Sequence, residues 1–269
     1  MGEVALESTE TTIEIGGMPI LIRTDNPEFF EVLIHRYGGF VNAAAKPVFE
    51  FDVEIVPPGK ITDEEELGLS FAGGRWVLER SDFHAEWNAA SGTGMIRQAA
   101  NPYAIDSAMR IVHSLLLARQ GGLLLHAASA VRNGRAFLFA GVSGAGKTTM
   151  ARLAPPNVTL LTDEISYLRK AAKGYTAFGT PFAGELAKPG ENISAPLAAV
   201  YLLAKGEENT IEPVSETHAV RGVLESVLFF AKDPELVGHV FESACELVRQ
   251  VPVLRLTFVP DARVWEMVG

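Results

Sequence analysis

A run of nine residues, from Gly141 to Thr149, constrains this chain more than any other part of its sequence. The run reads Gly-Val-Ser-Gly-Ala-Gly-Lys-Thr-Thr and fits the phosphate-loop pattern G-x-x-x-x-G-K-[ST]. Its glycines let the backbone curl so that successive N–H groups point inward at a phosphate. The predicted phosphate-binding residues are Gly141, Val142, Ser143, Gly144, Ala145, Gly146, Lys147, Thr148 and Thr149.

The segments on either side of the run have the character that a phosphate loop requires. Residues 135–140 form an apolar strand leading in, and a helix is expected to begin at Thr148. Lys147 supplies a positive charge for the β- and γ-phosphates, and the hydroxyl of Thr148 is a ligand suited to Mg²⁺. The positive end of the helix favours the same anion. The sequence therefore predicts that ATP and Mg²⁺ bind here.

Composition excludes several other partners. The 269 residues carry a net charge of −10, with 23 basic against 33 acidic side chains, which disfavours binding to nucleic acid and to anionic membranes. Cys245 is the only cysteine, so an internal disulfide and a cysteine-based zinc site are both excluded. No apolar run reaches the roughly 18 residues of a membrane span, and the acidic N-terminus lacks the basic start of a secretory signal. We therefore expect a cytoplasmic protein.

The pattern of elements changes near residue 103. Before it, alternating apolar and polar residues predict half-buried antiparallel strands, with one helix at 27–37 capped by Asn26. After it, strands alternate with helices, which favours a mainly parallel sheet flanked by helices. Helices are expected at 104–119, 216–229 and 234–249. The sequence thus predicts two domains, a β-rich one over 1–103 and an α/β one over 104–269.

A hairpin turn brings a histidine toward the phosphate loop. Asn133-Gly134 between two apolar runs is a strong signal for a two-residue turn, which places Arg132 opposite Arg135. If that register continues, His126 lies opposite Gly141. The alternative is that His126 is an ordinary core histidine with its hydrogen bonds satisfied.

Two acidic groups follow the loop in the sequence. The apolar strand 158–162 ends in Asp163 and Glu164 and should run parallel to the strand that feeds the loop. Ligands gather at the carboxyl ends of such strands, so this pair is expected either to hold Mg²⁺ or to accept a proton from an attacking hydroxyl. A structural cap at the strand end is the alternative. Glu185 ends a Gly- and Pro-rich loop, which alone is more typical of a solvent-facing turn.

Taken together, these residues resemble the catalytic domain of the bacterial HPr kinase/phosphorylase family and its HPr-kinase-like relatives. The features that carry the resemblance are His126, the loop 141–149, the pair Asp163-Glu164 and Glu185, and the ending 251–256 followed by Pro260-Asp261 is also similar. The resemblance covers about residues 104–269. It implies an α/β P-loop kinase domain of the HPr kinase/phosphoenolpyruvate carboxykinase type, preceded by a small β-rich (α+β) N-terminal domain.

The resemblance also implies a role for each residue. Asp163 would accept the proton, and His126 would orient Asp163 or stabilise charge beside it. Lys147 would bridge the phosphates, while Thr148 and Glu185 would bind Mg²⁺. Glu164, from the acidic pair, is a further candidate ligand for the metal.

The function expected from these features is an ATP- and Mg²⁺-dependent kinase. It would transfer the γ-phosphoryl group to a hydroxyl, either a seryl group of a protein or peptide or a small-molecule alcohol. One alternative is a non-catalytic ATP-binding regulatory module. Another is a simple ATPase, for which Arg152 or Arg255 would have to serve as the arginine finger. The resemblance leaves room for a homo-oligomer.

Overall fold

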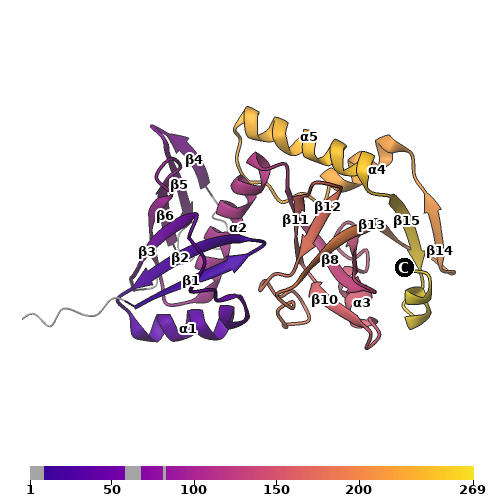
Figure 1. The fold of residues 1–269 in the computed structure, drawn as a ribbon, viewed down its shortest axis with the longest axis horizontal. Helices are drawn as coiled ribbons and strands as arrows, with labels where there is room; N and C mark the ends of the chain where they lie inside the picture. Colours follow the sequence, from indigo (N-terminus) through magenta and orange to yellow (C-terminus); the bar gives the residue numbers. More distant parts are fainter. Residues whose placement is uncertain (1–8, 58–67, 81–82) are drawn as a thin grey trace, which may run out of the picture. The chain divides into compact units, whose positions relative to one another are not determined.

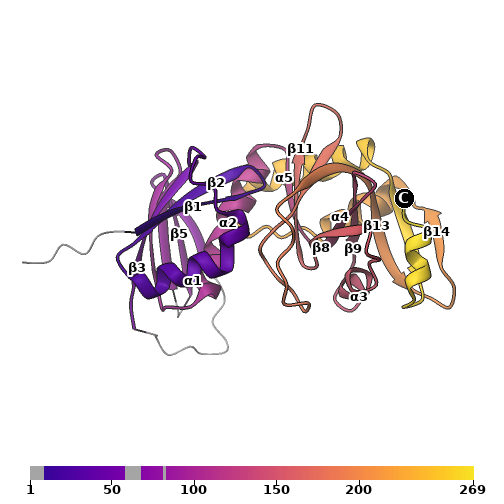
Figure 2. The ribbon, with the colours of Figure 1, turned by 60° about the horizontal axis from the view of Figure 1, so that its bottom comes forward.

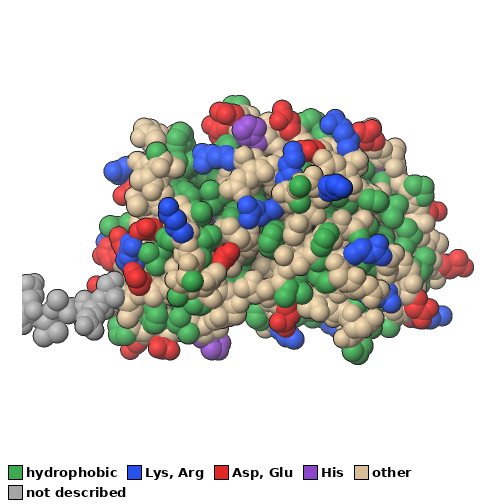
Figure 3. Space-filling view, viewed as in Figure 1, with side chains coloured by type: hydrophobic (Ala, Val, Ile, Leu, Met, Phe, Trp, Pro, Cys, Tyr) green, Lys and Arg blue, Asp and Glu red, His purple; other side chains and the backbone are tan. Residues whose placement is uncertain are grey.

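The computed structural model describes residues 9–57, 68–80 and 83–269, shown as a ribbon in Figure 1 and as a space-filling view from the same side in Figure 3. The chain divides into two compact units, Met1–Val112 and His113–Gly269. Helix α2 (Pro102–Arg119) continues from the first unit into the second. None of the helices within the described ranges is both long enough and apolar enough to cross a membrane.

The described part of the first unit is built on a seven-stranded sheet with the order β1-β2-β3-β7-β6-β5-β4. Strand β3 pairs in parallel with both β2 and β7, and the other neighbours are antiparallel. The predicted antiparallel arrangement is therefore correct only in part. The strands are β1 (Thr9–Ile15), β2 (Met18–Thr24), β3 (Phe49–Ile55), β4 (Gly68–Ala72), β5 (Arg75–Arg80), β6 (Phe83–Asn88) and β7 (Thr93–Gln98).

Helix α1 (Pro27–Tyr37) forms where the sequence predicts it. The side chain of Asn26 accepts a hydrogen bond from the backbone N–H of Phe29 at 2.8 Å, and Pro27 takes the first helical position. The helix buries Phe29, Leu33 and Tyr37. A short 3-10 helix, η1 (Gly38–Phe40), follows it directly.

A buried carboxylate joins α1 to α2 within the first unit. Asp106 on α2 is fully buried and forms an ion pair with Arg36, whose Nε lies 2.8 Å from Asp106 Oδ1. The hydroxyl of Tyr37 donates to the same oxygen. Burial and the charge of Asp106 raise the pKa of Tyr37 well above its usual value. The phenol is therefore a permanent donor to the carboxylate at physiological pH.

The second unit contains a closed barrel of five strands. Around the ring, β8 pairs with β11, β11 with β12, β12 with β13, β13 with β9, and β9 again with β8. Strand β10 extends the sheet from β8, while β15 and β14 extend it from β13. The strands are β8 (Leu123–Arg132), β9 (Arg135–Ala140), β10 (Val158–Thr162), β11 (Ile165–Lys170), β12 (Tyr175–Phe178), β13 (Ser194–Lys205), β14 (Thr210–Pro213) and β15 (Val253–Phe258).

The predicted fold class, an α/β P-loop kinase domain of the HPr kinase/phosphoenolpyruvate carboxykinase type, is wrong. The described residues are mostly β, with 40% in strands and 28% in helices. Among the described strands of the second unit, parallel pairing is limited to β13 with β9 and β13 with β15. The helix after the phosphate loop, α3 (Lys147–Arg152), has only six residues, which is too short to cover a sheet as a crossover helix does.

The remaining helices of the second unit are α4 (Glu216–Leu224), α5 (Pro234–Gln250) and the 3-10 helix η2 (Ala262–Glu266). The prediction for α5 is confirmed to within one residue at its end. The predicted extension of α4 to Phe229 is wrong, because the chain after Leu224 pairs with β8 instead. There the N–H of Leu228 donates to the carbonyl of Leu124 at 2.9 Å.

The C-terminal segment packs against α3, which Figure 2 shows next to β8 and β9. The indole N–H of Trp265 donates to the carbonyl of Met150 on α3 at 3.1 Å, and its ring packs edge-on against Phe139, with centroids 5.3 Å apart. Arg132 donates to the carbonyls of Trp265 and Val268. These contacts fix α3, and the loop before it, against the barrel.

We expect Asp106→Ala to destabilise the first unit by about 3 kcal/mol, because it leaves the buried Tyr37 and the partly buried Arg36 without their acceptor. Urea unfolding followed by tryptophan fluorescence, to which Trp76 and Trp87 contribute, measures the change. The matched control is Asp52→Ala. Asp52 is 68% exposed and lies 3.8 Å from Arg23, so its loss should cost less than about 1 kcal/mol. Equal effects of the two variants would contradict this role for Asp106.

Candidate functional site

The phosphate loop connects β9 to α3, in the order strand, loop and helix that the sequence predicts. Gly144 and Gly146 both have positive φ, at 76° and 112°. A Cβ added to Gly146 would lie 2.5 Å from the ring of Phe258, so the loop rests directly on this buried side chain of β15. At Gly144 an added Cβ would have no described atom within 4 Å, so this side of the loop is open.

Lys147 is held by its own loop. Only 7% of the residue is exposed, and Nζ donates to the carbonyls of Gly141 at 3.0 Å and Val142 at 3.3 Å. Burial lowers the pKa of Lys147, while the charges of Glu164 and Glu185 act in the opposite direction. Both carboxylates are therefore close enough to influence the ammonium group electrostatically.

The hairpin register predicted from Asn133-Gly134 is confirmed. The pairs run from Arg132 opposite Arg135 to Ala127 opposite Ala140. The pairing ends one residue before His126, whose N–H donates to the carbonyl of Ser226 at 2.7 Å instead of pairing with Gly141.

The half-buried His126 nevertheless lines the same cavity as the phosphate loop. Burial and the nearby charge of Lys147 lower the pKa of its imidazole. The side chain is therefore neutral near pH 7 and can either donate or accept a hydrogen bond.

The acidic pair lies at the junction of two strands. Strands β10 and β11 both run antiparallel to β8, and Asp163 and Glu164 connect them. The hydroxyl of Thr162 accepts hydrogen bonds from the N–H groups of Glu164 at 3.1 Å and Ile165 at 3.0 Å, which shapes the bend. Strand β10 has the same direction as β9, as predicted, but β8 lies between them.

Asp163 holds the turn that carries Glu185. Its Oδ1 accepts from the N–H of Gly184 and its Oδ2 from the N–H of Leu186, both at 2.9 Å. The turn closes with a 3.0 Å bond from the N–H of Ala187 to the carbonyl of Gly184, and Ala187 has a φ of 50°. Only 5% of Asp163 is exposed. The loop is thus anchored to the site, which its composition alone does not reveal.

One cavity of about 510 Å³ collects the predicted side chains. Every predicted catalytic and metal-binding residue lines it, and so do four further residues of the loop. These lining residues are His126, Lys147, Thr148, Asp163, Glu164 and Glu185, together with Ser143, Gly144, Gly146 and Thr149. Gly141, Val142 and Ala145 do not line this cavity, although the sequence predicted them as phosphate-binding residues.

The cavity has one charged residue that the sequence reasoning missed. Lys205, at the end of β13, also lines it. The polar run that begins at Lys205 is typical of a solvated turn, so the sequence does not indicate that Lys205 lines a cavity. The sequence carries no local signal for it, because Lys205 reaches the cavity through the parallel pairing of β13 with β9, by which both strands end at the same edge.

The donor set suits a hard cation that arrives with a phosphate. Thr148, Glu164 and Glu185 all offer oxygen ligands, which Mg²⁺ prefers. Within the described ranges, no group of three or more His, Cys, Asp or Glu side chains is arranged to hold a metal ion. Mg²⁺ commonly binds through one or two carboxylates plus substrate phosphates, so these residues fit a metal shared with a nucleotide better than a cage made by protein alone.

Comparison with protein families identifies a relationship that the sequence reasoning did not. The model of the family described as SynChlorMet cassette protein ScmC matches residues 97–269, which include the whole cavity. None of the curated proteins matches the chain. The predicted membership in the HPr kinase/phosphorylase family is therefore wrong. A short motif such as the phosphate loop carries a risk of false matches, so it does not by itself identify a family. The chain belongs to the ScmC family.

Proposed function

We propose that the protein is an ATP- and Mg²⁺-dependent phosphotransferase that moves the γ-phosphoryl group to a hydroxyl. The observation that carries the proposal is the single cavity in which the phosphate loop, Lys147 and three carboxylates meet. Its volume of about 510 Å³ lies in the range of small-molecule sites. Because the donor is ATP, we also propose that the protein acts in the cytoplasm.

The loop and two lysines would bind the triphosphate. Backbone N–H groups of the loop donate hydrogen bonds to phosphate oxygens, and Lys147 exchanges its two carbonyl partners for phosphate oxygens. Lys205 adds a second positive charge to the lining of the same cavity. Helix α3 is too short for its dipole to add much, so most of the binding falls to the loop and the lysines. Mg²⁺, when bound through Thr148 and the carboxylates, neutralises charge on the phosphates.

The transfer step assigns a role to Asp163. The acceptor oxygen forms a bond to the γ-phosphorus, the bond from that phosphorus to the bridging oxygen breaks, and ADP leaves with the electron pair. The hydroxyl proton passes to Asp163. Each carboxylate oxygen already accepts one N–H bond and retains a lone pair for a second. His126, neutral near pH 7, lines the same cavity as the loop and can hydrogen-bond to a group that is bound there.

A specific observation favours a second candidate, the non-catalytic ATP-binding module. Both oxygens of Asp163 hold the Glu185 turn, and this contact by itself explains why a buried carboxylate is present. In that case ATP would order the turn and the loop, and a partner would recognise the change. The two candidates differ in whether any acceptor receives phosphate.

We expect Lys147→Ala to weaken nucleotide binding at least tenfold, because no other group supplies a positive charge within the loop itself. Titration of a fluorescent ATP analogue in the presence of MgCl₂ measures the affinity. Lys173→Ala is the control, since Lys173 is an exposed lysine in the turn between β11 and β12. Circular dichroism checks that the buried substitution leaves the fold intact. Unchanged affinity in the folded variant would contradict nucleotide binding at the loop.

Asp163→Asn separates catalysis from positioning when it is compared with Gly184→Ala. A Cβ at position 184 would lie 2.9 Å from Asp163 Oδ2, so Gly184→Ala disturbs the turn but keeps the carboxylate. If Asp163 accepts the proton, Asp163→Asn should lower transfer about 10²- to 10⁴-fold, and Gly184→Ala much less. The measurement follows label from γ-labelled ATP into a size-fractionated extract of the source cells. Equal losses of phosphoryl transfer in both variants would contradict the role of proton acceptor and show that Asp163 only positions the turn.

A further inference from the structure

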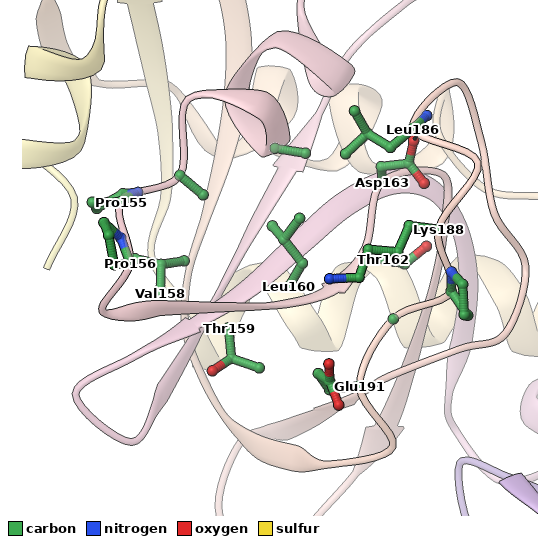
Figure 4. Close-up of a pocket in the computed structure, with 14 residues that line it drawn as sticks. Pro155, Pro156, Val158, Thr159, Leu160, Thr162, Asp163, Leu186, Lys188 and Glu191 are labelled. Carbon is green, nitrogen blue, oxygen red and sulfur yellow. Dashed lines mark hydrogen bonds between the residues drawn. The ribbon is translucent and has the colours of Figure 1, made fainter. Parts of the chain in front are cut away.

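A second cavity, of about 320 Å³, lies next to the first (Figure 4). The end of α3 and the Pro155-Pro156 turn form one wall, and residues 186–191 form the other. Figure 4 shows Asp163 and Leu186 side by side on one side of this cavity, with Pro155 and Pro156 on the other. Asp163 is the residue that lines both cavities.

The wall of the second cavity is fixed in place by backbone contacts. The N–H of Thr180 donates to the carbonyl of Leu161 at 3.0 Å, and the N–H of Glu191 donates to that of Leu160 at 3.1 Å. The N–H of Gly190 bonds to Thr180 at 3.0 Å, and a Cβ added to Gly190 would lie 1.6 Å from the carbonyl oxygen of Leu161. The loop is therefore pinned against β10, and the cavity is preformed rather than dependent on a moving segment.

The lining of the second cavity combines an apolar floor with opposite charges. Leu160 and Leu186 are half-buried, whereas Lys188 and Glu191 are exposed. Apart from Asp163, the rest of the lining is mainly small or apolar. Such a surface suits a ligand that places apolar and charged groups a few atoms apart.

We propose that this second cavity binds the phosphoryl acceptor, and that the acceptor is a peptide segment with a seryl or threonyl hydroxyl at Asp163. The inference rests on the proposed function. A triphosphate on the loop fills the first cavity, so the acceptor must reach Asp163 from another side, and the second cavity provides that approach. A small alcohol would leave most of 320 Å³ empty. An apolar neighbour of the hydroxyl-bearing residue packs on Leu160 and Leu186, and an acidic one pairs with Lys188.

The test uses blocked heptapeptides with a fixed central serine and γ-labelled ATP with MgCl₂. At each other position Leu, Asp and Lys are tried in turn, with alanine elsewhere. We expect the label to pass to the peptides. At one position, transfer should be at least tenfold faster with Leu than with Ala, and at another it should be at least tenfold faster with Asp than with Lys. Lys188→Glu should reverse the preference for Asp over Lys while leaving nucleotide affinity unchanged. Lys173→Glu, the same charge change at a distant exposed lysine, should leave the preference as it is.

The outcomes separate this inference from the proposed function on which it rests. Labelled peptides with preferences that Lys188→Glu does not alter would overturn the assignment of the cavity. Transfer to glycerol or ethanolamine but to none of the peptides would overturn the peptide acceptor and leave the phosphotransferase standing. Failure to bind the fluorescent ATP analogue would remove the proposed function, and the inference with it.

Discussion

The two hydrogen bonds from the turn at Gly184 and Leu186 to the carboxylate of Asp163 hold the candidate site together. Without them a buried carboxylate and two backbone N–H groups would each lack a partner, which is costly in the interior of a protein. With them, Glu185 lines the first cavity and Leu186, the next residue, lines the second. The two cavities are therefore products of one local arrangement and not independent features of the surface.

The features that the sequence predicted well depend on neighbouring residues. Asn26 caps α1 through a bond to a residue three positions later, and Asn133-Gly134 sets the β8–β9 register through the turn itself. The phosphate loop is equally local, since nine consecutive residues define it. The predicted register holds as far as Ala127, one residue before His126, whose N–H bonds to Ser226 instead. A contact between residues 100 positions apart cannot be predicted from the sequence around either of them.

The features that the sequence did not predict depend on distant pairing. Closure of the barrel requires β12 to pair with β13 and β13 with β9, which joins Leu197 to Ala136. Alternation of strands and helices does not distinguish this closed, mainly antiparallel ring from an open parallel sheet when the intervening helix has only six residues. The contacts of Asp163 with residues 21 and 23 positions later are of the same kind. The prediction of family membership was wrong for a different reason, because it rested on a few short motifs, whereas the family model compares residues 97–269 as a whole.

The positioning role of Asp163 and the proposed chemical role are compatible. Phosphoryl transfer passes through a loose transition state and depends chiefly on placing the reacting groups and on neutralising charge. A carboxylate that two backbone amides already orient loses little freedom when an acceptor arrives, so its second lone pairs are directed before the reaction begins. The same two bonds set the distance between the carboxylate and the turn that carries Glu185. An aspartate in this position can therefore build the site and also act in it, and the contact that fixes the turn is also what would orient the proton acceptor.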